Sequence, residues 1–229
     1  VQILAQRLLE SKAYDVAIVA GCDIQSKFIV SGFQSFKAVS TEECRPFDED
    51  RFGLNLGEAA STIIYIRAHE AKTDDWVLCK GAVRNDAFHI SGPSKTAEGS
   101  YRSLHQVMQG EDASRIACIS AHGTATLYND DMESKAIDRE GMSQTLVSGL
   151  KGYYGHTMGA AGLLETILTM HAIDEGWVPG TRGFSACGTS RELFVSGQHQ
   201  PTQKRQFIKL MSGFGGCNAA ALFKKGDQL

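Results

Sequence analysis

The sequence lacks the cysteine patterns that mark disulfide-linked and metal-binding proteins. Its six cysteines include no CxxC pair and no histidine partner at zinc-finger spacing, which argues against a disulfide scaffold and a structural metal site. They are scattered along the 229 residues, at Cys22, Cys44, Cys79, Cys118, Cys187 and Cys217. Such cysteines are typical of reduced, buried thiols, so we expect a cytoplasmic protein without a metal ion.

The chain also lacks a strong net charge and any long hydrophobic run. A net charge of −3 and a pI near 6.2 argue against a basic nucleic-acid-binding protein. The apolar stretches have the length of strands and fall well short of the ~20 residues that a membrane-spanning helix needs. With 42% hydrophobic and 21% charged residues, the composition is that of an ordinary globular protein. We therefore expect no nucleic-acid or membrane partner.

An initiator methionine is absent as well, and the chain opens inside a helical pattern. Val1, Leu4, Leu8 and Leu9 recur at the spacing of one helix face, which predicts a helix over residues 1–12. We expect from this opening that the sequence is a piece of a longer protein.

Strand and helix patterns alternate along the remainder of the chain. Strands are predicted at residues 15–21, 60–67, 76–82, 116–121, 145–148, 207–212 and 219–224. Helices are predicted at 98–109, 130–140 and 159–174, the second of them capped by Asn129 or Asp130. This alternation predicts a layered α/β fold.

Two features refine this organisation. The first strand, DVAIVAG, is almost continuously apolar and is therefore predicted to be covered on both faces, whereas the Gly- and Ser-containing stretch after it is predicted to be a loop. The short charged segment 69–75 is the best candidate for a joint, which divides the chain into residues 1–70 and 71–229.

Three glycine-rich turns carry the residues most suited to chemistry. The first contains His122, with Glu133 following it; the second runs from Lys151 to Gly162 around His156; the third is centred on Phe214. A lone histidine is more often structural than catalytic. Two histidines in separate turns at strand ends, with a lysine five positions before the second, favour a catalytic site because such loops commonly carry chemistry.

In their order and spacing, these turns closely resemble those of the elongating β-ketoacyl-acyl-carrier-protein synthases. The segment K-x-x-x-G-H-x-x-G-A-A-G from Lys151 to Gly162 is the most specific match, and GFGG-x-N from Gly213 to Asn218 follows it. Upstream, Arg45-Pro46-Phe47-Asp48 matches the family as well, so that the resemblance covers essentially the whole chain.

The resemblance implies a fold, a reaction and partners. The fold is the thiolase-like α-β-α-β-α arrangement, with the C-terminal half complete and the N-terminal half partial. The reaction is the decarboxylative Claisen condensation of malonyl-carrier protein with an acyl thioester, in fatty acid or polyketide-type biosynthesis. The substrates are carried on the phosphopantetheine of acyl carrier protein, so no cofactor is expected. The intact protein is expected to be a homodimer.

The resemblance also implies roles for individual residues. His122 and His156 would donate hydrogen bonds to the malonyl thioester carbonyl and stabilise the enolate, and Lys151, paired with Glu165, would orient them. Phe214 would be the gating phenylalanine and its backbone N–H part of an oxyanion hole. The flanking glycines let the backbone approach closely, and three hydroxyl side chains would line the substrate channel. These glycines and hydroxyl residues are Gly213, Gly215, Thr124, Thr126 and Ser91.

The family's cysteine nucleophile has no counterpart among the 229 residues. By the resemblance it lies several residues before Val1, and Cys217 beside the third turn is expected to be a packing thiol. We therefore expect the 229-residue piece to be inactive alone. Two alternatives stay open: a non-catalytic chain-length-factor-like partner subunit, and a thiolase that uses Cys217 as a base.

Overall fold

The computed structural model describes residues 1–70 and 72–228. The helices are α1 (Gln2–Glu10), α2 (Lys27–Ser35), α3 (Glu98–Met108), α4 (Leu127–Arg139), α5 (Lys151–Tyr154) and α6 (Ala161–Asp174). The strands are β1 (Val16–Asp23), β2 (Ala59–Ile66), β3 (Trp76–Asn85), β4 (Cys118–Ser120), β5 (Val147–Ser148), β6 (Trp177–Val178), β7 (Gln200–Pro201), β8 (Gln206–Gly213) and β9 (Cys217–Lys225). Within these described ranges, no helix combines the length and the apolar character needed to cross a membrane.

A five-stranded mixed sheet forms the centre of the molecule, in the order β3-β9-β8-β4-β5. The strands β3, β9 and β8 pair antiparallel, whereas β4 runs parallel to both β8 and β5. Because β8, β4 and β5 are parallel, their carboxyl ends meet at one edge of the sheet. The three glycine-rich turns follow the ends of these same strands, so the topology gathers the candidate residues on one side.

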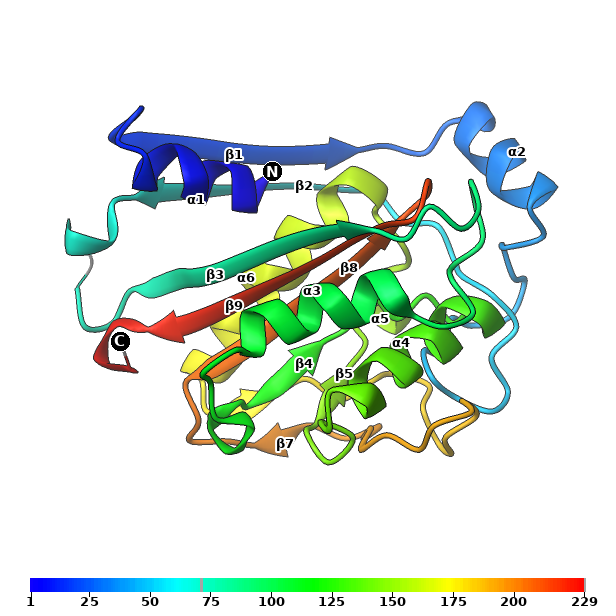
Figure 1. Ribbon diagram of the computed structural model, residues 1–229. Coiled ribbons are helices and arrows are strands. Elements are labelled where there is room, and N and C mark those ends of the chain that lie inside the picture. Colours follow the sequence, from blue (N-terminus) through cyan, green and yellow to red (C-terminus); the bar gives the residue numbers. More distant parts are fainter. Residues whose placement is uncertain (71, 229) are drawn as a thin grey trace.

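The other elements are stacked on this sheet in layers (Figure 1). The helices α3 and α4 cover one face, where Leu104 of α3 packs against Ile119 and Leu222 in the main core. The helix α6 covers the opposite face. Beyond it lies an antiparallel ribbon of β1 and β2, to which α1 and α6 are joined through a smaller cluster around Val19 and Leu163. The predicted layered α/β architecture is confirmed.

The prediction that β1 is covered on both faces is wrong for this chain. Val16 and Ile18 are 51% and 70% exposed, and their partners Ile66 and Ile64 on β2 are exposed with them. The intervening residues face α1 and α6, so the ribbon has one packed face and one apolar face open to solvent. Within the described residues nothing is layered on that open face.

Two helices differ from their sequence-based expectation. The helix α2 lies in a stretch predicted to be a loop; the Ser26 side chain caps it by accepting a hydrogen bond from the Ile29 N–H, although the helix buries none of its own residues. The helix α4 begins at Leu127 rather than at Asp130. Asn129 and Asp130 are therefore not caps, and their side chains are buried against the first histidine turn.

The division of the chain at residues 70 and 71 stays a prediction. Residue 71, inside the segment 69–75 that was expected to form the joint, lies outside the described residues. The preceding residues Ala68–Glu70 form a single 3-10 turn after β2.

Candidate active site

The turn that carries His122 is held by buried carboxylates from α4. Glu133 accepts the backbone N–H groups of His122 and Gly123, each at 2.7 Å, and Asp130 accepts that of Thr124 at 2.9 Å. Burial, with the neighbouring Asp130 second, raises the pKa of Glu133 to about 7. Because side-chain oxygens accept hydrogen bonds from these three backbone N–H groups, the turn has a fixed backbone although it belongs to no helix or strand.

The turn that carries His156 is equally constrained. Gly155 adopts a φ of +79°, and a side chain there would meet the backbone of Asn55 and Leu56 at about 2.9 Å. The His156 N–H donates to the carbonyl of Asn55 at 2.7 Å. The imidazole Nδ1 accepts the Met158 backbone N–H at 3.0 Å, so a neutral ring has its proton on Nε2.

The two imidazole rings meet beside a lysine, as the sequence predicts. Their centroids are 5.1 Å apart with an interplanar angle of 80°, and His122 and His156 are only 5% and 9% exposed. The Lys151 Nζ lies 3.5 Å from the His122 Nδ1. An ammonium group has no acceptor, so this long contact favours the Nε2–H form of His122 too. The site thus presents two imidazoles whose Nε2 groups are hydrogen-bond donors.

Both rings are neutral near pH 7. Burial lowers the pKa of His122 well below its usual value, and the Lys151 charge lowers it further. Burial, followed by the Lys151 ammonium group, lowers the pKa of His156 to about 3. Proximity to a cation and removal from water both disfavour an imidazolium ion.

The predicted pairing of Lys151 with Glu165 is present. The Lys151 Nζ donates to Glu165 Oε1 at 2.6 Å and to the carbonyl of His122. Sequence reasoning missed the second cation here: Lys209, on β8, donates to Glu165 Oε2. Burial alone would raise the pKa of Glu165, but the two ammonium groups outweigh it and hold that pKa below its usual value. The sequence feature that could have identified Lys209 is its place inside the apolar run of residues 207–211.

The remaining predicted residues fall into two groups. Thr124 and Thr126 belong to the first histidine turn, where their hydroxyl oxygens lie 2.8 Å apart. The other group surrounds the β8–β9 turn, where the Gly215 N–H donates to the Ile90 carbonyl, next to Ser91. The members of this second group are Ser91, Gly213, Phe214 and Gly215.

Phe214 is 52% exposed and belongs to an aromatic cluster with α2 and its C-cap. Its ring stacks on Phe33 with centroids 5.6 Å apart and meets the edge of Phe36 at 5.4 Å. Its ring contacts are thus with side chains of another element, on a turn that contains glycine. The contact also explains what α2 contributes, since Phe33 and Phe36 come from its end.

Cys44, a buried cysteine near the site, is a poor nucleophile. Cys44 is buried, and its thiol lies 3.8 Å from the carbonyl of Thr124. Burial raises the pKa of the Cys44 thiol to about 12, so it is protonated at neutral pH. Cys217 is exposed at the start of β9.

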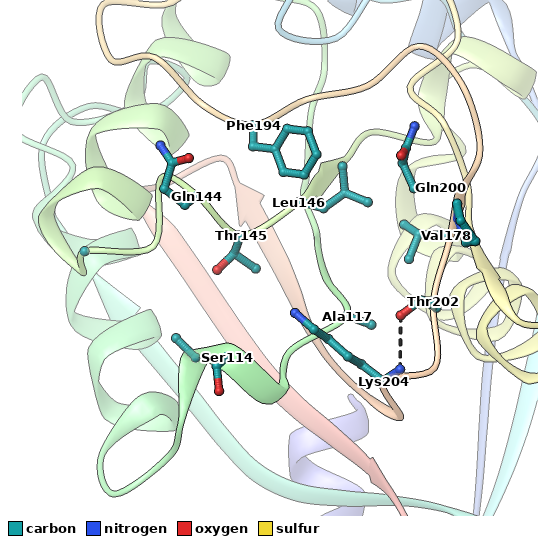
Figure 2. Close-up of a pocket in the computed structure, with 13 residues that line it drawn as sticks. Ser114, Ala117, Gln144, Thr145, Leu146, Val178, Phe194, Gln200, Thr202 and Lys204 are labelled. Atoms are coloured by element: carbon teal, nitrogen blue, oxygen red, sulfur yellow. Dashed lines mark hydrogen bonds between the residues drawn. The ribbon is translucent and has the colours of Figure 1, made fainter.

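A cavity of about 390 Å³ lies at the other end of the parallel strands. Figure 2 shows Ala117, Leu146, Val178 and Lys204 around it. Ala117 and Leu146 precede β4 and β5, whereas the histidine and lysine turns follow those strands. The cavity is therefore separate from the imidazole pair.

The depressed pKa of His156 predicts acid sensitivity. The unfolded chain binds a proton with a pKa of 6.5 and the folded chain with a pKa of about 3, so the unfolded state holds more protons between these pH values. Stability is therefore lost as the pH falls. Between pH 7 and pH 5 we expect the His156 contribution to the free energy of unfolding to shrink by roughly 2 kcal/mol.

Urea unfolding of the wild type and of His156→Asn at both pH values measures this difference. The variant is expected to lose about 2 kcal/mol less than the wild type on acidification. Equal losses would show that the His156 ring is protonated as readily in the folded chain as in water.

Comparisons with known proteins agree on one family. Residues 77–185 match the model of the β-ketoacyl synthase C-terminal domain. A 3-oxoacyl-[acyl-carrier-protein] synthase 2 of Rhizobium meliloti is 32% identical over 96% of this chain and 56% of the relative. Nodulation protein E of Rhizobium meliloti is 30% identical over 92% of this chain and 55% of its own length.

Solved structures give the same result. The ketosynthase ApeO of Xenorhabdus doucetiae, determined in complex with its chain length factor ApeC, matches with a TM-score of 0.90 and 31% identity, over 98% of this chain and 56% of that one. A β-ketoacyl synthase of Burkholderia phymatum matches with a TM-score of 0.89 and 26% identity, over 98% of this chain and 58% of that one. The chain thus has the fold of the ketosynthases and spans a little over half the length of the relatives it matches. In sequence and in fold it is similar to the β-ketoacyl synthases over that length.

Proposed function

We propose that His122, His156 and Lys151, with the residues around them, form the decarboxylation and condensation centre of a β-ketoacyl-acyl-carrier-protein synthase, an acyltransferase. The observation that supports this most is the buried pair of neutral imidazoles, His122 and His156, each with Nε2–H as its donor. A carbonyl oxygen placed between two such donors is stabilised as negative charge develops on it. The carrier protein supplies both substrates, and the intact enzyme is proposed to be a homodimer.

The proposed reaction proceeds in two stages, a decarboxylation and a condensation. The malonyl thioester loses carbon dioxide as its C–C bond breaks, and the electron pair moves into an enolate whose oxygen accepts hydrogen bonds from His122 and His156. The enolate carbon then attacks an acyl thioester, forming a C–C bond, while the acyl carbon–sulfur bond breaks and the thiolate departs. The Phe214 turn is proposed to lie beside the acyl carbonyl.

Lys151 and Glu165 support this chemistry without taking part in bond changes. The Lys151 ammonium group, anchored by Glu165, lies against His122, and together with burial, which is the larger cause, it lowers the pKa of both rings. The proposal takes its cysteine nucleophile from outside the 229 residues, because the resemblance places that cysteine before Val1, and Cys44 is protonated and buried. Retention of His122, Lys151 and His156 favours the enzyme over a chain-length-factor-like subunit.

An assay of the full-length protein with malonyl- and hexanoyl-carrier protein tests the proposal. We expect release of carbon dioxide together with a β-ketoacyl product two carbons longer, detected by mass spectrometry of the carrier-bound thioester. Thiolytic cleavage of acetoacetyl-coenzyme A without condensation would instead identify a thiolase. Activity that appears only when a separate synthase is added would identify a partner subunit.

A further inference from the structure

Lys209 occupies an unusual place for a lysine, at the centre of the main sheet. It lies on β8, the middle strand of the five, directly opposite Ser120 of β4. Its side chain is 2% exposed. An ammonium group removed from water costs several kcal/mol unless partners take its protons, so a buried lysine must be compensated locally.

The Lys209 ammonium group has a hydrogen-bond acceptor for each of its protons, and two of these acceptors belong to the backbone just before His122. The Lys209 Nζ donates to Glu165 Oε2 at 2.5 Å, to the carbonyl of Ala121 at 2.9 Å and to that of Ser120 at 3.1 Å. Three acceptors match the three protons of an ammonium group. Ser120 and Ala121 are the residues immediately before His122.

Lys151 binds the same turn at the next carbonyl along the chain, that of His122. It donates to the carbonyl of His122 and to the other oxygen of Glu165. Three successive carbonyls, from Ser120 to His122, thus accept hydrogen bonds from the two ammonium groups. Glu165 accepts a hydrogen bond from each of these groups as well. On the amide side of the turn, Glu133 and Asp130 accept the N–H groups.

We propose that Lys209 is a positioning residue of the active site, which acts through Glu165 and the carbonyls of Ser120 and Ala121 to fix the His122 ring. Its effect on catalysis rests on the proposed function above; its effect on the histidine does not. The turn is thus held by two buried ammonium groups that share one carboxylate, Glu165, on its carbonyl side, and by Glu133 and Asp130 on its amide side.

The electrostatics of the cluster agree with this role. Burial is the largest cause of the lowered pKa of His122, the Lys151 and His156 charges follow, and Lys209 lowers it further. Glu165 opposes the effect at His156. Burial lowers the pKa of Lys209 itself, against the attraction of Glu165.

Replacing Lys209 with methionine in the full-length protein tests the proposal by NMR of the histidine ring nitrogens at pH 7. The wild type is expected to show one Nε2–H pattern for His122, whereas Lys209→Met is expected to show an average of two tautomers or two ring positions. Lys224→Met is the matched control, because Lys224 lies on the neighbouring strand β9 and pairs with Glu111 at 2.7 Å. The control is expected to leave the His122 pattern unchanged.

In the full-length protein, Lys209→Met is expected to lower kcat for malonyl decarboxylation by roughly 10–100-fold with little change in KM, since misplacing a donor costs rate rather than binding. If the methionine variant does not fold, Lys209→Gln, which keeps an N–H donor, takes the same measurements. A folded variant with an unchanged His122 pattern would overturn the proposal. A wild type that shows the Nε2–H pattern but does not decarboxylate malonyl-carrier protein would overturn the proposed function alone.

Discussion

Replacing His156 with alanine is expected to lower kcat for malonyl decarboxylation in the full-length protein by about 10²–10³-fold. The reason is that the Nε2–H of a neutral, buried imidazole is worth most where charge develops away from water. The His156 ring is 9% exposed, and its other nitrogen is already bonded to the Met158 N–H. Release of carbon dioxide from malonyl-carrier protein measures the effect.

The control for this experiment is His105→Ala. His105 lies on α3, is 51% exposed and contacts Glu140 at 3.0 Å, so its loss is expected to leave the rate unchanged. Full activity in His156→Ala would refute the role given to that ring. A comparable loss in His105→Ala would point to general damage to the fold.

The second large effect is expected in stability, from Glu165→Gln. Glu165 is completely buried and accepts hydrogen bonds from both Lys151 and Lys209. Its replacement by an amide leaves two ammonium groups in the interior without a counter-charge, a change that typically destabilises by 3–5 kcal/mol, so we expect a loss of about that size. Urea unfolding of the wild type and the variant at pH 7 measures it.

Glu111→Gln provides a matched control, since Glu111 also pairs with two lysines. Lys80 and Lys224 contact its oxygens at 2.6 and 2.7 Å, but this cluster reaches solvent and Lys80 is 36% exposed. Because water can replace the lost carboxylate, the expected loss is only about 1 kcal/mol. Equal losses in the two variants would mean that burial does not govern the Glu165 cluster.

The chemistry-bearing turns could be predicted from the sequence because glycine and histidine follow recognisable strands. His122, His156 and Lys151 lie where those patterns place them, and the Glu165 pairing follows from its position early in a helix. That these side chains lie close together depends on the parallel alignment of β4, β5 and β8. Hydrophobic periodicity predicts strands but carries no information on their order.

The features that the sequence did not predict also depend on contacts between distant segments. Lys209 lies within an apolar run, and its burial follows from β8 being the central strand, which depends on pairing between distant segments. The helix α2 has a serine cap and an amphipathic pattern, but it is only nine residues long and lies in a stretch that contains glycine and serine. Asp130 resembles a helix cap by residue type, yet its carboxylate is used by the neighbouring turn.

The hydrogen bond from the Met158 N–H to the Nδ1 of His156 has a consequence for proton transfer. With the δ lone pair occupied and the ε nitrogen protonated, the ring has no free basic nitrogen. Turning it by half a rotation would break the bond to Met158 and place the Cδ2–H group against the Met158 N–H. His156 is therefore a fixed dipole rather than a proton relay, and a proton that the reaction consumes must arrive by another route, such as water.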